Sequence, residues 1–224
     1  MSRPRSLRLA ACVAGLAAVI VGCDPIAPTA PTPSPGATLP AGQPANGPVA
    51  KWPAPSDPIA RTTAAGLVAE TAERLAFHVH AHLDVFIDGA PVVVPAGIGI
   101  NIADPGVSEF DLPDGTKSYG GIQGCGQPCI SPLHTHDETG VIHTESATPT
   151  PNTLGQFFTE WGVPLSATCV GEYCAPQTVI AIYLNGTPFT GDPTAIQLSN
   201  LLEIAIVIGT PPPVIPATAD FSQP

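Results

Sequence analysis

The sequence has few basic residues for its number of acidic ones. It holds 7 Lys and Arg against 18 Asp and Glu in 224 residues. Three of the basic residues, Arg3, Arg5 and Arg8, stand at the start, so the sequence beyond residue 22 carries four and a formal charge of −14. Such a chain offers no basic patch to nucleic acid phosphates or to anionic lipid headgroups. We therefore expect no nucleic acid partner and no charge-driven binding to lipid.

Long hydrophobic runs are also missing, apart from one near the start. Residues 9–21 are apolar, interrupted only by Gly15, and are too few to span a bilayer comfortably as a permanent helix. With the arginines around it, this run predicts a signal peptide over residues 1–22. Residues 20–23 (Ile-Val-Gly-Cys) resemble the lipobox of bacterial lipoproteins. The resemblance implies a lipid on Cys23 that anchors the protein at the extracytoplasmic face of the cell membrane; the alternative is an ordinary secretory signal with a chance cysteine.

Large apolar side chains are scarce in the segment that follows. Residues 24–58 contain eleven prolines among small residues, a composition that cannot bury a core and favours extended chain. We expect residues 23–60 to form a disordered tether that reaches up to about 100 Å, at roughly 3 Å per residue. Residues 210–224 predict a shorter proline-rich, disordered tail. This leaves residues 61–209, a length that can bury a core of its own, as a single domain.

Free cysteines are not expected in this domain. Cys12 leaves with the signal and Cys23 carries lipid, so four cysteines remain in an oxidising compartment, where an even number predicts disulfides. Their spacing favours two local bridges over a crossed pairing, although the spacing alone leaves both open. The alternative, a four-cysteine zinc site, has spacings longer than the usual Cys-x-x-Cys. The four residues form two close pairs: Cys125 with Cys129, and Cys169 with Cys174.

The first half of the domain predicts one helix and one long strand. Apolar residues at helical spacing indicate a helix over residues 62–75. Residues 77–87 alternate strictly, which predicts a strand with one apolar face and one histidine-bearing face. The Asp-Gly pair at 88–89 predicts a tight turn and an antiparallel return at 91–95. Residues 96–130 are rich in Gly, Pro and Asp and predict a long loop.

The second half predicts further strands around a capped helix. Residues 141–146 predict a short strand, and residues 153–162 a helix that begins with a capping box. Residues 178–184 and 202–208 predict strands, and Asn-Gly at 185–186 predicts a turn. The sequence therefore predicts a small, β-rich α+β domain of antiparallel hairpins and two short helices. The order helix, strand, turn, strand is similar to that of a β-grasp unit.

The histidines are confined to two short windows. Side chains at i and i+2 of a strand project from the same face, so two imidazoles at this spacing can bind one cation. Asp84, Asp137 and Glu145 stand beside the histidines in sequence, where a carboxylate can ligate a metal or orient an imidazole. The alternative is a pH-sensing cluster that titrates near pH 6. The six predicted metal ligands are His78, His80, His82, His134, His136 and His143.

The available ligand types limit the metal. Imidazole with carboxylate suits Zn(II), Cu(II), Ni(II) or Fe(II). Met1 is the only methionine, so the thioether ligands that Cu(I) carriers favour are missing. We expect a divalent ion, Zn(II) or Cu(II).

Three segments together resemble a family of uncharacterised exported proteins of actinobacteria with archaeal relatives. Their sequences are Phe-His-Val-His-Ala-His-Leu-Asp-Val-Phe-Ile-Asp-Gly (77–89), Pro-Leu-His-Thr-His-Asp-Glu-Thr-Gly-Val-Ile-His-Thr-Glu-Ser (132–146) and Thr-Leu-Gly-Gln-Phe-Phe-Thr-Glu-Trp-Gly (153–162). The resemblance covers most of 77–209 and implies export, but it does not imply an activity.

Three functions are compatible with these features. The first is an envelope lipoprotein that captures, buffers or delivers a divalent metal. The second is a metalloenzyme with an open coordination position, in which Glu145 or Asp137 is a candidate base. The third is an interaction module with a structural metal, whose binding surface is the loop over 96–130. A protein partner is not identified by the sequence.

Overall fold

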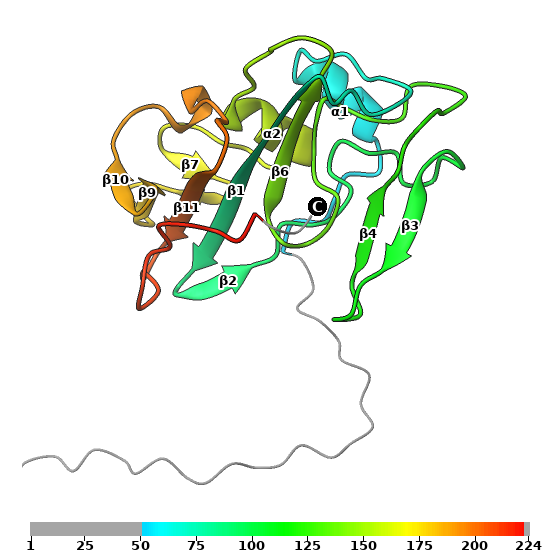
Figure 1. Cartoon of the computed structure of the whole chain (residues 1–224). Coiled ribbons are helices and arrows are strands. Elements are labelled where there is room, and N and C mark those ends of the chain that lie inside the picture. The colour runs from blue at the N-terminus through cyan, green and yellow to red at the C-terminus, as the bar shows by residue number, and fades with distance from the viewer. Residues whose placement is uncertain (1–50, 222–224) are drawn as a thin grey trace, which may run out of the picture. The chain divides into compact units, whose positions relative to one another are not determined.

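The computed structural model describes residues 51–221, which form a small α+β domain (Figure 1). The predicted signal peptide and Cys23 lie outside the described residues. The helical elements of the described part are α1 (Pro58–Ala64), α2 (Leu154–Trp161) and the 3-10 turn η1 (Pro193–Ala195). The strands are β1 (Phe77–Ile87), β2 (Ala90–Val92), β3 (Ser108–Asp111), β4 (Lys117–Gly120), β5 (Leu133–His134), β6 (Val141–Ser146), β7 (Cys169–Val170), β8 (Tyr173–Cys174), β9 (Ile180–Leu184), β10 (Thr187–Phe189) and β11 (Leu202–Ile208).

A seven-stranded mixed sheet organises the domain. Its strands lie in the order β10-β9-β11-β1-β6-β5, and β2 pairs with the C-terminal end of β1. The predicted hairpins are present at Asp88-Gly89 and Asn185-Gly186, where the chain takes positive φ angles. The central pair, β1 with β11, is parallel, which the expectation of antiparallel hairpins did not include. No local turn signals such a pair, because its strands lie far apart in sequence and need a crossover connection.

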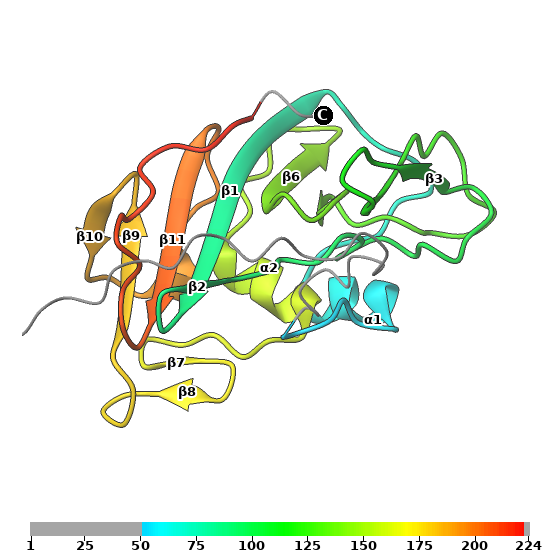
Figure 2. The ribbon, with the colours of Figure 1, turned by 90° about the horizontal axis from the view of Figure 1, so that it is seen from below.

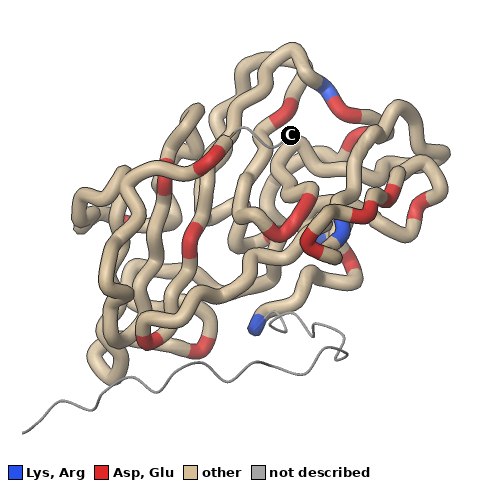
Figure 3. Tube along the Cα trace, turned by 60° about the horizontal axis from the view of Figure 1, so that its bottom comes forward, with Lys and Arg blue, Asp and Glu red and all other residues tan. Residues whose placement is uncertain are grey.

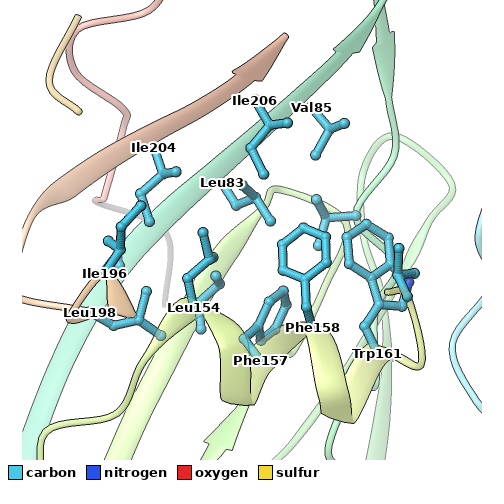
Figure 4. Packing of buried hydrophobic residues seen from close by; sticks show 14 of the residues in the cluster. Leu83, Val85, Leu154, Phe157, Phe158, Trp161, Ile196, Leu198, Ile204 and Ile206 are labelled. Carbon is cyan, nitrogen blue, oxygen red and sulfur yellow. The ribbon is translucent and has the colours of Figure 1, made fainter. Parts of the chain in front are cut away.

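The strict alternation of β1 separates a core face from a polar face. Ala81, Leu83 and Val85 are buried, and on β11 Ile204 and Ile206 lie opposite Leu83 and Val85 in the register. These side chains pack against α2, which lies along one side of the sheet (Figures 2 and 4). The histidines of β1 therefore project from the opposite face of the sheet.

The start and end of α2 follow from its sequence. Thr153 accepts a hydrogen bond from the Gln156 backbone N–H, and the Gln156 side chain accepts one from the Thr153 N–H. This is the predicted capping box. The helix ends at Gly162, whose φ of 79° is the left-handed conformation that glycine adopts at low cost. Between these caps α2 directs Phe157, Phe158 and Trp161 into the core, as shown in Figure 4.

The predicted helix over 62–75 is wrong. The helix α1 begins earlier, at Pro58, and ends at Ala64, after which Gly66 takes a φ of 75°. Beyond it the chain is not helical, and the backbone of Glu70 pairs with that of Ile130. The apolar stripe that suggested a longer helix is split, because Leu67 packs against the core whereas Val68 and Leu75 are 76% and 59% exposed.

The segment over 96–130 is not only a loop. It contains the hairpin of β3 and β4, in which all four residues of β3 are exposed, so no burial pattern marks the strand in the sequence. Lys117 forms ion pairs with Glu109 and Asp111 across this hairpin. The return strand β2 is also shorter than predicted.

Both predicted disulfides are local. The bridges join Cys125 to Cys129 and Cys169 to Cys174, as the close spacing favoured. A four-cysteine zinc site is therefore not formed. The oxidised sulfurs are not available as metal ligands.

The domain extends beyond the predicted edges at 61 and 209. Trp52 packs edge-on against Trp161 at 5.8 Å between ring centroids, and its carbonyl accepts a hydrogen bond from the Trp161 indole. After β11 the chain crosses the polar face of the sheet (Figure 1), and the ring of Phe221 reaches that of His82. These contacts use aromatic residues isolated within proline-rich sequence. Within residues 51–221 no helix is long and apolar enough to cross a membrane.

Glu160 of α2 is an acid buried in the core region. Its side chain is fully buried, and neither carboxyl oxygen has a well-formed hydrogen bond. Burial raises the pKa of Glu160 from 4.5 to about 8, and the Ser131 and Thr62 hydroxyls oppose this shift only in part. Between these two values the folded state holds one more proton than the unfolded chain. The free energy of unfolding is therefore highest, as far as this group is concerned, below pH 4.5, and it falls as the pH rises to about 8.

We predict that Glu160→Gln removes this loss. At pH 5 the variant and the natural chain should unfold at similar urea concentrations. As the pH rises to 8, the natural chain should lose about 1.4 kcal/mol of unfolding free energy per pH unit relative to the variant. Urea unfolding at several pH values measures the difference. Glu109→Gln, at an exposed carboxylate, is the matched control, and a gap between natural chain and Glu160→Gln that does not change with pH contradicts the assignment.

Candidate metal centre

Three neighbouring strands bring histidines from both sequence windows into one row. In the register of the sheet, His80 on β1 lies opposite His143 on β6, and His143 lies opposite His134 on β5. In the next row on the same face, His78 lies opposite Glu145. The pairing of β1 with β6 thus joins residues that are more than fifty positions apart in sequence. Figure 1 shows β1 and β6 side by side at this position.

The Glu145 carboxylate is the centre of the cluster. Its Oε1 lies 3.1 Å from His78 Nε2, 3.4 Å from His143 Nδ1 and 3.9 Å from His134 Nε2. The side chain is only 4% exposed, and Oε2 has no hydrogen-bond partner. A buried carboxylate with one oxygen left without a donor is costly unless a cation balances its charge.

Two further imidazoles complete the group. His80 Nε2 lies 2.8 Å from His78 Nε2, and His136 Nε2 lies 3.2 Å from His134 Nε2. Five histidine rings and one carboxylate therefore converge on one region of the polar face. We refer to these six residues as the histidine cluster: His78, His80, His134, His136, His143 and Glu145.

In two of these rings, a hydrogen bond to a backbone carbonyl determines which nitrogen has a lone pair available to a ligand. His134 Nδ1 lies 2.9 Å from the Ser131 carbonyl oxygen, and His136 Nδ1 is hydrogen-bonded to the Tyr119 carbonyl. A carbonyl only accepts, so both rings carry their hydrogen on Nδ1. The two Nε2 lone pairs then face each other, an arrangement that requires a cation or a proton between them. Hydrogen bonds of this kind orient histidine ligands in metal sites.

Burial disfavours a proton in this position. Burial, followed by the charges of His136 and His143, lowers the pKa of His134 well below 6.5. Burial also lowers the pKa of His143 to about 3 and that of His80 to about 4, with neighbouring histidines adding to both shifts. These three imidazoles are therefore neutral at pH 7, and their lone pairs are available to a metal. The pH-sensing alternative requires rings that titrate near pH 6, which these three do not.

The spacing of the ligand atoms fits a transition metal. Two donors at about 2.1 Å from a tetrahedral ion are about 3.4 Å apart. The Nε2 atoms of His134 and His136 are 3.2 Å apart. His78 Nε2 lies 3.5 Å from His143 Nδ1. One ligand atom from each of His134, His136, His143 and Glu145 lies within 4.8 Å of the others, and the same holds for His78, His80 and His143. These groups could hold a metal ion, and they share His143.

Three predicted site residues lie outside the histidine cluster. His82 is on the same face of β1, but it contacts Glu203 on β11, with Asp84 beside it. The Asp137 carboxylate accepts hydrogen bonds from the backbone and the hydroxyl of Thr139, so it shapes the turn before β6. Sequence reasoning did not identify Glu203. Its signal was a single acid in the otherwise apolar run of 202–208.

The histidine cluster lies in an acidic domain and is partly open to solvent. Figure 3 shows Asp and Glu spread along the described chain, with few Lys or Arg. The His78 side chain is 35% exposed, whereas those of His134 and His143 are 0% and 4% exposed. A groove of about 320 Å³ borders the ring of His136 and is lined by Phe110 and Leu112, among others. The cluster thus has an outer side at His78 and a buried inner side.

Compared with known proteins, the chain matches no protein-family model, no curated protein and no solved structure. The chemistry of the site therefore follows from its own residues.

We predict that His80→Ala and His136→Ala each weaken metal binding by roughly tenfold or more, the scale for losing a metal-site partner. Competition of the purified chain with a chromophoric chelator for Zn(II) measures the affinity. Glu109→Gln, at an exposed carboxylate of β3 outside the histidine cluster, serves as the control. It should leave the highest-affinity binding unchanged. Full affinity in His136→Ala shows that this ring is not a ligand.

Proposed function

We propose that this protein is a membrane-anchored extracytoplasmic lipoprotein that binds a divalent transition metal through the histidine cluster. Its role is the capture, buffering or delivery of that metal. The observation that carries the proposal is the convergence of five imidazoles, of which His80, His134 and His143 are neutral at pH 7, on the buried carboxylate of Glu145. Two of these rings have tautomers set by backbone carbonyls, which leaves both Nε2 atoms free for a metal.

The ligand set favours Zn(II) or Cu(II). Imidazoles with a carboxylate suit both ions. The cysteines of the described domain are oxidised, and methionine is confined to Met1, so soft sulfur ligands for Cu(I) are missing from this domain. The acidic composition favours attraction of cations to the domain surface.

The difference in exposure across the cluster supports exchange of the metal. His78 and His80 offer nitrogens on the solvent side, and His134 and His143 offer them in the interior. Because both groups share His143, an ion can pass inward by replacing one ligand at a time. A structural site has no need of such an exposed set of ligands.

A metalloenzyme is the second candidate, and the groove beside His136 is the observation that favours it. Its volume of about 320 Å³ admits a small organic molecule next to a ligand ring. In this case Glu145 is the candidate base, because Thr139 already occupies the carboxylate of Asp137. The groove contacts His136 but not His134 or His143, which makes this candidate weaker.

The proposed localisation of the protein rests on the sequence. The signal-like run and the lipobox-like ending at Cys23 support anchoring at the extracytoplasmic face of the membrane. Two disulfides in the domain agree with an oxidising compartment. We also propose membership of the exported actinobacterial family that the three histidine and helix segments resemble.

Reversible metal loading tests the proposed function. We predict that the chain, purified without a polyhistidine tag, contains Zn(II) or Cu(II) by elemental analysis. Chelation should remove the metal while the circular dichroism spectrum stays that of a folded domain, and added metal should rebind. Unfolding on chelation favours a structural metal instead. A folded, metal-free chain that binds neither ion contradicts the proposal.

The lipid anchor has a separate test. We predict that the chain, expressed in a bacterial host, incorporates labelled fatty acid and sediments with membranes. Cys23→Ser should lose the label and the sedimentation, because the thiol is the lipidated atom. Cys12→Ser, within the signal itself, is the control and should keep both. A label that persists in Cys23→Ser places the lipid elsewhere.

A further inference from the structure

A second group of metal-binding side chains lies on the same sheet face, on the opposite edge of β1. In the parallel pairing of β1 with β11, His82 lies opposite Glu203. His82 Nδ1 is 2.8 Å from Glu203 Oε2 and 3.8 Å from Asp84 Oδ2. One ligand atom from each of these three residues lies within 4.8 Å of the others.

The other nitrogen of His82 is already occupied. Nε2 lies 2.7 Å from the Thr139 carbonyl oxygen, and a carbonyl only accepts, so the ring carries a hydrogen on Nε2. Gly140 allows this close approach, since a Cβ there would lie 3.0 Å from His82 Nε2 and 2.7 Å from the Leu83 carbonyl oxygen. Nδ1 is therefore the atom directed at the two carboxylates. This is the arrangement in which a backbone carbonyl orients a histidine ligand.

The buried carboxylate of Glu203 is the feature that indicates a bound cation. Its side chain is fully buried, and its Oε1 has no hydrogen-bond partner. The side chain of Asp84, 31% exposed, adds a second negative charge beside it. A proton on His82 balances one of the two charges and leaves the other carboxylate oxygen without a donor.

Basic side chains do not supply the missing charge. In the part of the chain that the structure describes, Lys51, Arg61, Arg74 and Lys117 form their ion pairs with other acids. The positive charge that would balance Glu203 and Asp84 must therefore come from a group in solution. A divalent cation neutralises both carboxylates at once.

We propose that His82, Asp84 and Glu203 form a second metal site, separate from the histidine cluster. It binds a divalent cation through one imidazole nitrogen and two carboxylates. This ligand set is harder than that of the histidine cluster, so it accepts Mn(II) as well as Zn(II). A groove of about 180 Å³, which Asp84, Thr139 and Gly140 help to line, borders the proposed site at Asp84. The Phe221 ring, 6.3 Å from the His82 ring between centroids, covers part of the site.

Metal counting by equilibrium dialysis tests this site. The full chain is dialysed against Mn(II) alone and against Zn(II) alone, and bound metal per chain is measured by elemental analysis. We expect Glu203→Gln and Asp84→Asn each to bind one equivalent fewer than the natural chain with both ions. His143→Ala disrupts the histidine cluster and should keep the Mn(II) equivalent. Glu109→Gln is the control for the loss of one carboxylate and should bind as the natural chain does.

Each outcome decides between the metal site and an ion pair of protonated His82 with Glu203. Equal metal counts in the natural chain, Glu203→Gln and Asp84→Asn overturn the second site and leave the histidine cluster untouched. Conversely, the loss of one Zn(II) equivalent in His143→Ala, with the second Zn(II) equivalent and the Mn(II) equivalent retained, supports two independent sites. Glu203→Gln changes a buried group, so circular dichroism must show that it folds. If it does not, Asp84→Asn decides, because its side chain is partly exposed.

Discussion

The pairing of β1 with its neighbours is the constraint on which the rest of the structure depends. One edge of β1 pairs with β6 and β2, and the other with the parallel strand β11. Because alternate side chains of a strand point to opposite faces, this one register places Leu83 in the core and His80 beside His143. A shift by one residue would expose the apolar face and bury the imidazoles. Core packing against α2 therefore also keeps the histidine row aligned.

Desolvation of ligands is the second constraint, and it separates the two candidate metal sites. In the histidine cluster, burial keeps the rings of His134 and His143 neutral, and the Ser131 carbonyl accepts the hydrogen bond from His134 Nδ1. In the second site, burial acts on Glu203 and raises its pKa, while the hydrogen bond to His82 opposes the shift. The first site is rich in nitrogen and the second in oxygen. β1 thus contributes histidines to two candidate sites whose ligand sets differ in hardness.

Much of the fold could be predicted wherever a signal is local. The alternation of 77–87, the capping box before α2 and the apolar run of β11 each depend on neighbours in sequence, and all three elements are present. The predicted helix over 62–75 is wrong because Gly66 interrupts it with a positive φ and because Val68 and Leu75 of its apolar stripe point to solvent. The hairpin of β3 and β4 was missed because all four residues of β3 are exposed, so this strand has no apolar face that the sequence could reveal.

The sequence by itself determined the ligand types and their spacing within each window, because side chains two apart on a strand must share a face. It also determined that cysteine pairs close in sequence lie within reach of a local disulfide. Only the tertiary structure decided that five histidines, and not six, converge on Glu145. It assigned His82 to Glu203 because β11 inserts beside β1 in parallel. Partners across a sheet depend on which strands pair, and packing of the whole chain decides that pairing.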